Sequence, residues 1–224
     1  MTYPMLARAI RSGSPEQVAD LVRTCWLDPI ANGGSDLRAV HHPLGFTCLP
    51  VLRDGAQGIC VHLFGERRTP VRLSVSPFHC HSWDLLSHIL YGEVGNQNVT
   101  VVPGNTYRVF DTRTTATGDR LVPTDDTVDA TAGEPEYWAA GEAYELTAGR
   151  FHASTVRSAA PAATVVLGLH HPGRPDLTLG GLGTPAHRLT RRLYARTETV
   201  LLARTVLDRL AVGAAASLVP AGRP

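Results

Sequence analysis

The sequence predicts an all-β protein with flanking helices: one antiparallel barrel over residues 45–172, a helical extension over 1–44, and a linker and helix over 173–224. Three observations lead to this fold class. Apolar residues recur at helical spacing near both ends of the chain. Between these ends the period of alternation falls to two, as in half-buried strands. Turn residues recur at regular intervals there, which is typical of antiparallel sandwiches and barrels.

The N-terminal helix is indicated by its start signals. Ser14 is a favourable N-cap, Pro15 suits the first helical position, and Gln17 completes a capping box. Apolar side chains then follow at helical spacing, namely Val18, Leu21, Val22, Cys25 and Trp26. We expect a helix of about three turns that packs on the outside of the barrel.

Strands are expected wherever the period is two. They are 46–53, 58–64, 71–75, 78–82, 86–91, 98–102, 107–111, 137–139, 143–146, 151–156 and 164–170. Asp54-Gly55 is a hairpin signal between the first two strands. The segment 112–134, rich in Thr, Asp and Gly, is expected to be a long loop, either a lid or a plain insertion.

The C-terminal segment is expected to hold a glycine-rich linker and a long helix over about 186–212. Its apolar stripe either packs back on the barrel or joins a second subunit, and it consists of Leu189, Leu193, Val200, Ala203, Leu207 and Leu210.

Composition excludes several classes of protein. The net charge is +1 and no basic run stands out, so neither nucleic acid nor an anionic membrane is an expected partner. No apolar run is long enough to span a membrane and no signal-peptide pattern follows Met1, so we expect a cytoplasmic protein. The four cysteines lack Cys-x-x-Cys spacing, and we expect small buried apolar residues rather than disulfides or a zinc site.

His79 and His81 are the strongest candidates for chemistry. Side chains two apart on a strand share a face, so both imidazoles can reach one point while Cys80 faces the other way. Imidazole is the commonest metal ligand in proteins, although two ordinary histidines at a strand edge remain the alternative. An apolar strand that closes on Gly92, and a distant segment that ends at His152, favour a metal site.

These two segments resemble the two motifs of the cupin superfamily, whose fold is an antiparallel double-stranded β-helix, or jelly roll. His79, His81 and Gly92 match the first motif, which has His-x-His, a glutamate and a glycine. The second motif is Pro-x-Gly, two residues, then His, and Gly149 and His152 match it with Ala148 in place of the proline. The resemblance covers roughly residues 45–172.

The resemblance implies a metal site of three histidines, His79, His81 and His152. Leu85 stands where the family has its glutamate ligand, and Asp84, one residue away, would face the opposite side of the strand. Iron(II) is the metal that the resemblance favours, since cupins without the glutamate often look like oxygenases; zinc, manganese or nickel would suit the same ligands.

Further site residues follow from a more distant similarity to cupins of the cysteine dioxygenase type. That family clamps a substrate carboxylate with an arginine one hairpin before His-x-His; Arg53 matches this place, with a solvated surface arginine as the alternative and Arg72 as a weaker rival. The cysteine and the tyrosine of the family's crosslink are absent, because Leu85 and the His170-His171 segment stand near those positions.

Two other side chains are candidates for the interior of the barrel. His170 could face inward as an acid–base group, with His171 outward, and the hydroxyl of Tyr144 could point into the barrel, although core packing is the simpler role. His88 is expected on the face away from the metal ligands, and His62 has no evident partner.

Three function classes are therefore open. The first is a nonhaem iron dioxygenase or oxidase of a small polar metabolite, either amino-acid-like or a carboxylate. The second is a cupin isomerase, lyase or decarboxylase that uses zinc, manganese or nickel as a Lewis acid. The third is a non-catalytic cupin that binds a small molecule. A small-molecule substrate and O₂ are the expected partners of the first class, and a homodimer is possible.

Overall fold

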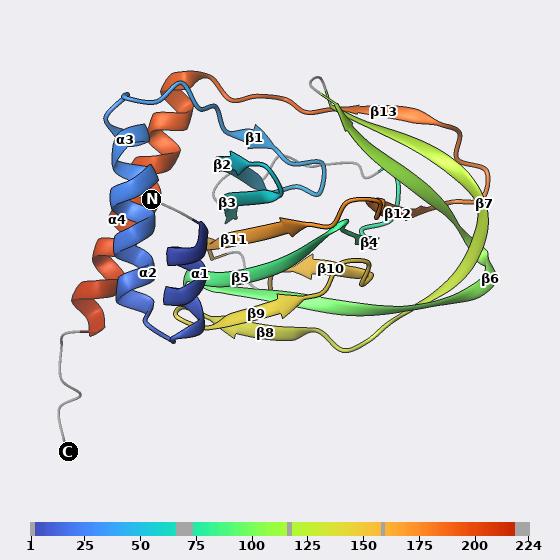
Figure 1. Ribbon diagram of the computed structural model, residues 1–224, viewed down its shortest axis with the longest axis horizontal. Helices are drawn as coiled ribbons and strands as arrows, with labels where there is room; N and C mark the ends of the chain where they lie inside the picture. The colour runs from blue at the N-terminus through green and yellow to red at the C-terminus, as the bar shows by residue number, and fades with distance from the viewer. Residues whose placement is uncertain (1–2, 66–73, 116–117, 158–159, 218–224) are drawn as a thin grey trace, which may run out of the picture.

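Two antiparallel β-sheets, with helices against one of them, make up the computed structural model, which describes residues 3–65, 74–115, 118–157 and 160–217 (Figure 1). The helices gather at one end of the molecule in this view. They are α1 (Tyr3–Arg11), α2 (Pro15–Val22), the π-helical turn η1 (Arg23–Leu27), α3 (Asp28–Ala31) and α4 (Arg196–Ser217).

The first sheet has the strand order β1-β2-β3-β11-β5-β9. Its strands are β1 (Val40–His41), β2 (Thr47–Asp54), β3 (Gln57–Phe64), β11 (Ala162–His170), β5 (Trp83–Tyr91) and β9 (Ala143–Leu146).

The second sheet has the order β10-β4-β12-β6-β7-β13, and β8 also pairs with β6. Its strands are β10 (His152–Thr155), β4 (His79–Cys80), β12 (Leu177–Gly180), β6 (Glu93–Thr115), β7 (Gly118–Ala132), β13 (His187–Thr190) and β8 (Glu136–Ala139). The pairings between these strands are antiparallel throughout the part of the chain that the structure describes. The predicted fold class, antiparallel β with flanking helices, is confirmed.

Alternation along the first sheet separates two environments. One face packs against the helices, and its buried members include Leu49, Ile59, Val61, Leu63, Val165 and Leu167. The residues between them, such as Cys60, His62 and Val166, line a cavity that is also lined by residues of the second sheet. The helices therefore cover the outer face of the sheet, as the sequence predicted for the N-terminal helix, and the inner face is left for a site.

The prediction of a long loop at 112–134 is wrong. Most of that segment is β7, which pairs with β6 from Val99↔Ala132 to Thr115↔Gly118 and forms a long hairpin that curves around the end opposite the helices (Figure 1). The side chains of β7 are mostly polar and half-exposed, so the apolar alternation that marks a buried strand is weak there. Ladder hydrogen bonds and β-branched side chains account for this strand.

The C-terminal part also differs from expectation. The expected linker contains β12 and β13, and the helix begins at Arg196 rather than near 186. Three of its side chains, Leu202, Ala203 and Val206, are buried in the same core as α3, so the helix packs back on its own chain. Helix α1 was not predicted, and of the expected strand 71–75 only 74–75 lies in the described residues, where it is not a strand. Within those residues no helix is long and apolar enough to cross a membrane.

Gly92 lies between β5 and β6 in the left-handed region, with a φ of +76°. A Cβ atom at this position would lie 2.6 Å from the carbonyl oxygen of Pro161 and 2.7 Å from the Cβ of Ala162. We expect Gly92→Ala to lower the free energy of unfolding in urea by at least about 2 kcal/mol, because backbone strain and steric overlap add. Gly13→Ala is the control: Gly13 has a φ of +64° and no atom within 4 Å of its added Cβ, so equal losses would contradict the steric part.

His88 lies on the helix-facing side of β5, between Leu86 and Leu90, and is 3% exposed. Burial lowers the pKa of its imidazole to about 4. An unfolded histidine titrates near 6.5, so between pH 6.5 and 4 the unfolded chain binds a proton that the folded chain does not. The free energy of unfolding therefore decreases as the pH is lowered through this range. His88→Leu should flatten this fall by up to about 1.4 kcal/mol per pH unit in urea unfolding measured at several pH values. The half-exposed His187→Leu is the control, and an unchanged slope in His88→Leu would contradict the assignment.

Candidate metal centre

The structure brings together the three histidines that the sequence singled out. Strand β4, which carries His79, lies between β10 and β12, and its register places His152 directly opposite His79. Ring centroids are 4.8 Å apart for His79 and His81, 4.4 Å for His79 and His152, and 5.1 Å for His81 and His152. One possible ligand atom from each ring lies within 4.8 Å of the others.

The segment before β10 is tied to the residues around His81. Gly149 has a φ of +83°, a conformation that favours glycine, and its N–H donates to the carbonyl oxygen of His81 at 2.8 Å. The N–H of Ala148 donates to Oδ1 of Asp84 at 2.8 Å. The two segments that resemble the cupin motifs are therefore held against each other by one backbone–backbone hydrogen bond and one hydrogen bond to a carboxylate side chain.

Two of the rings are oriented by backbone carbonyl groups. The Nδ1 atom of His79 lies 2.8 Å from the oxygen of Pro77, and the Nδ1 atom of His152 lies 3.1 Å from the oxygen of Arg150. A carbonyl oxygen only accepts, so each Nδ1 carries the proton and each Nε2 keeps a lone pair for a metal. Burial lowers the pKa of His79, lowers that of His81 well below its usual value, and lowers that of His152 to about 3. All three rings are thus neutral near pH 7.

His81 is held by an aromatic neighbour. Its ring stacks on Trp83 with centroids 4.1 Å apart and planes 24° apart. The indole in turn covers Gly168 of β11, where a Cβ atom would lie 2.9 Å from Cε3 of Trp83. Because residue 168 has no side chain, the indole can lie close to the sheet. The indole in turn positions the imidazole of His81, the third of the three rings.

The residue after Asp84 occupies the position at which the cupin motif has its glutamate. Leu85 is 7% exposed and lines the cavity. Asp84 lies on the other side of the strand, where its Oδ2 is 2.8 Å from Nε2 of His171. Within the described residues, no carboxylate belongs to the three-histidine group. The expected register, with Leu85 inward and both Asp84 and His171 turned away, is therefore observed.

The histidines face a cavity of about 350 Å³ between the two sheets. Its apolar lining includes Leu44, Phe46, Phe64, Trp83, Leu85 and Val166. Tyr144 also lines it, stacked on Trp138 at a centroid distance of 4.3 Å, and burial raises the pKa of its hydroxyl. His170 lines the cavity as an exposed residue, with its Nδ1 3.0 Å from Oγ of Ser82. A small molecule would therefore meet apolar walls and a few polar groups.

Arg53 also lines the cavity, but in a different setting from the one expected. The residue is exposed beside the β2–β3 turn, and its Nη1 donates to the carbonyl oxygen of Leu52 at 2.7 Å. Its Nη2 donates to Sγ of Cys60 at 3.2 Å. The exposure fits the alternative of a solvated surface arginine, so the argument from Arg53 to a carboxylate substrate loses its basis.

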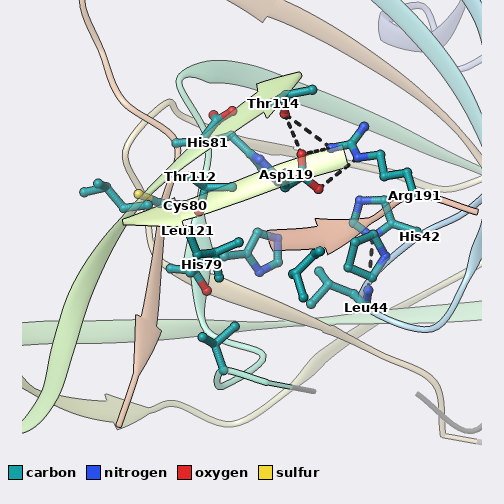
Figure 2. A pocket seen from close by; sticks show the side chains of 16 residues that line it. His42, Leu44, His79, Cys80, His81, Thr112, Thr114, Asp119, Leu121 and Arg191 are labelled. Atoms are coloured by element: carbon teal, nitrogen blue, oxygen red, sulfur yellow. Dashed lines mark hydrogen bonds and ion pairs between the residues drawn. The ribbon is translucent and has the colours of Figure 1, made fainter. Parts of the chain in front are cut away.

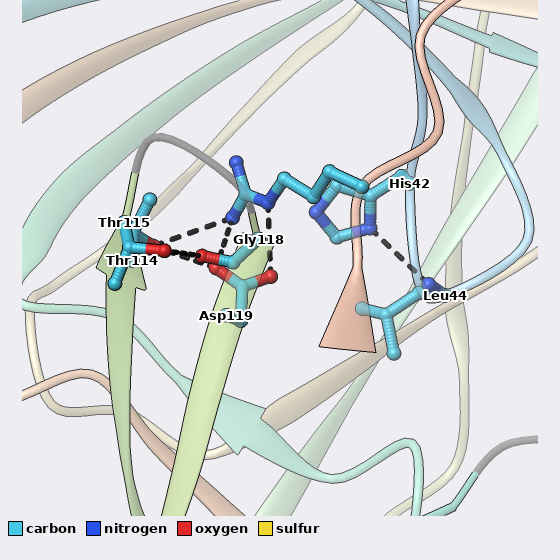
Figure 3. A network of polar contacts seen from close by, with 7 residues as sticks. His42, Leu44, Thr114, Thr115, Gly118 and Asp119 are labelled. Carbon is cyan, nitrogen blue, oxygen red and sulfur yellow. Dashed lines mark hydrogen bonds and ion pairs between the residues drawn. The ribbon is translucent and has the colours of Figure 1, made fainter. Parts of the chain in front are cut away.

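A second arginine, Arg191, lies where this cavity meets a smaller one of about 110 Å³ (Figure 2). Its Nε and Nη2 donate to the two carboxylate oxygens of Asp119 at 2.9 and 2.8 Å, and Oγ1 of Thr114 donates to Oδ1 of Asp119 at 2.9 Å (Figure 3). The Asp119 side chain is 4% exposed and that of Arg191 is 33% exposed. This bidentate pair neutralises the charge beside the cavity, and sequence reasoning missed it because β7 and β13 were not predicted.

A second possible ligand cluster, also missed, lies on the inner face of the first sheet. Cys48, Cys60 and His62 each offer a ligand atom, and these atoms lie within 4.8 Å of one another. The hydrogen bond between the two thiols holds the pKa of Cys60 well below its usual value and raises that of Cys48. The signal was Cys60-x-His62, which has the same face-sharing spacing as His79-x-His81.

Comparisons with known proteins find similarity to solved structures at low sequence identity. No family model matches the chain, and no curated protein matches it. Among solved structures, hydroxypropylphosphonic acid epoxidase from S. wedmorenis is similar over 56% of this chain and 50% of its own, with a TM-score of 0.31 and 10% identity. Procruciferin, an 11S globulin from Brassica napus, is similar over 69% of this chain and 33% of its own, with a TM-score of 0.33 and 13% identity. The chain thus spans half or less of the length of these proteins.

Proposed function

We propose that this chain is a metal-dependent enzyme of the cupin type, and specifically a nonhaem iron(II) dioxygenase or oxidase of a small polar metabolite. One observation carries the proposal: three neutral histidines offer ligand atoms within 4.8 Å of one another at the wall of a cavity of about 350 Å³. Three imidazoles leave coordination positions free, and a cavity of this size is within the range for small-molecule sites.

The residues present fit a divalent metal. The hydrogen bonds from Nδ1 of His79 and His152 leave Nε2 of each ring for the metal, and the depressed pKa values mean that protons do not compete for these atoms near pH 7. When bound, iron(II) would supply the redox chemistry with O₂ that protein side chains lack.

The chain's own residues would bind and orient the substrate. The apolar wall around Phe46, Phe64 and Val166 would exclude water from the face that carries the histidines. Burial keeps the Tyr144 hydroxyl protonated, so that it can donate a hydrogen bond to a substrate oxygen. His170 lines the cavity with its Nδ1 3.0 Å from Oγ of Ser82, so its ring can contact a bound substrate. Arg53 is left without an assigned role in substrate binding, and the substrate class rests on cavity size and polarity.

The experiment is anaerobic reconstitution with Fe(II), followed by a panel of small polar metabolites with O₂ consumption recorded. We expect at least one compound to be consumed together with O₂ by the iron-loaded protein. His152→Ala should abolish this consumption, and zinc-loaded protein should not support it. Turnover of a panel compound by zinc-loaded protein without O₂ would contradict the proposal and favour Lewis-acid chemistry. Equal O₂ consumption by the wild type and His152→Ala would contradict the assignment of the site.

A further inference from the structure

The cluster of Cys48, Cys60 and His62 is built from two neighbouring strands. Cys60 and His62 are two residues apart on β3 and share its inner face, and the register places Cys48 of β2 opposite His62. All three side chains line the same cavity as the three-histidine site, from the opposite sheet. Cys48 is 8% exposed, whereas Cys60 and His62 are half-buried.

The donor set differs in kind from that of the three histidines. Two sulfur atoms and one imidazole form a soft set, which suits zinc better than a metal that prefers oxygen ligands. Nη2 of Arg53 donates to Sγ of Cys60 at 3.2 Å, a contact that helps to orient this thiol. Metal binding would displace the thiol protons, and two thiolates would then cancel the charge of a divalent cation. Three ligands leave a fourth position for water or a small molecule from the cavity.

A disulfide between Cys48 and Cys60 is the competing use of these thiols. Because His62 is the residue opposite Cys48, Cys60 is its diagonal neighbour across the strand pair. The β2–β3 ladder is irregular between Leu49 and Leu52, which is where Cys60 lies, and the two thiols are hydrogen-bonded to each other. Both cysteines are free thiols in the structure. A shared metal and a disulfide are therefore alternatives that the mass measurement below distinguishes.

We propose that Cys48, Cys60 and His62 form a second metal site, which binds zinc through two thiolates and one imidazole. This site is distinct from the three-histidine site and goes beyond the proposed function, since it holds whether or not that site binds iron. The cavity then has two unlike metal-binding walls, one of imidazoles alone on the second sheet and one with thiolates on the first.

Cobalt(II) is a suitable probe for the zinc site because thiolate ligands give it an intense charge-transfer absorption in the near ultraviolet, which imidazole ligands do not. Reduced wild-type protein is titrated anaerobically with Co(II), and metal bound per chain is measured with the spectrum. We expect two equivalents, one for each of the two clusters in the described residues, together with the thiolate band.

Three variants separate the sites. Cys48→Ser/Cys60→Ser should lose the thiolate band and one equivalent, whereas the triple variant His79→Ala/His81→Ala/His152→Ala should lose one equivalent and keep the band. Cys25→Ser, in η1 and outside both clusters, should behave as the wild type. If urea unfolding shows that the double variant is unstable, Cys60→Ser alone replaces it, because Cys60 is only half-buried. This single variant should also lose the thiolate band.

Three results would overturn the proposal. One is a wild-type spectrum without a thiolate band at saturating Co(II). Another is a band that survives in Cys60→Ser. The last is an intact mass lower by two hydrogens after aerobic purification, which disappears in Cys60→Ser and would show a disulfide instead. None of these results bears on the three-histidine site, because the Co(II) bound there is measured separately, as the equivalent that the triple histidine variant loses.

Discussion

Replacement of His152 by alanine is expected to release the metal from the three-histidine site. Removal of a group that only orients a ligand already costs roughly 10–100-fold in metal affinity, and loss of a ligand should cost more than that. The remaining pair, His79 and His81, leaves the metal open to water and chelators. The measurement is iron bound per chain after anaerobic loading and dialysis, made in a Cys60→Ser background so that thiols do not contribute.

Two comparisons distinguish the loss of a metal ligand from the loss of the fold. His79→Ala, on a different strand, should lose metal to the same extent, and both variants should keep a cooperative urea transition. His187→Ala is the matched control, because His187 belongs to neither possible ligand cluster in the described residues. Full metal retention by both His152→Ala and His79→Ala would contradict the site.

Arg191→Ala is expected to lower the free energy of unfolding by about 3–5 kcal/mol, because it leaves a buried carboxylate without its counter-ion. The Asp119 side chain is only 4% exposed, and Thr114 would be its remaining hydrogen-bond donor among the contacts described above. Urea unfolding measures the loss of unfolding free energy. The slope of that free energy against urea concentration should be the same as in the wild type.

The matched control is an exposed pair on the same hairpin. Nε of Arg113 lies 2.8 Å from Oδ2 of Asp111, and the two side chains are 67% and 24% exposed, so the carboxylate is far less buried than that of Asp119. Arg113→Ala should therefore cost no more than about 1 kcal/mol. Arg191→Met/Asp119→Leu, which removes both charges, should recover most of the loss. Equal losses for Arg191→Ala and Arg113→Ala would contradict the role of burial.

The parts of the fold that could be predicted are those in which one face is apolar. Strand β3, which follows the hairpin at Asp54-Gly55, alternates between a helix-packed core and the cavity, and this alternation is visible in the sequence. Strand β5 is buried on both faces and stands out as a mainly apolar run that ends at Gly92. Strand β7 could not be found in this way, since its side chains are mostly half-exposed and its position depends on pairing with β6. Strand β12 is only Leu177–Gly180 and lies in a glycine-rich segment.

The candidate site was partly predictable for the same reason. The alternation of a strand places His79 with His81 and turns Asp84 away from Leu85, so the ligand pair and the empty glutamate position follow from local geometry. The position of His152 depended on the resemblance to a family. The setting of Arg53 depends on how the hairpin meets the thiol of Cys60, which spacing along one strand does not reveal.

Strand β4 is only two residues long, yet it joins segments from distant parts of the sequence, with β10 on one side and β12 on the other. A metal held by His79, His81 and His152 would act there as a reversible cross-link that closes a long loop of the chain. Such a cross-link restricts the unfolded ensemble more than a local contact does. The loaded chain should therefore open at β4 less often than the metal-free chain, so the supply of metal would influence how long this protein survives proteases.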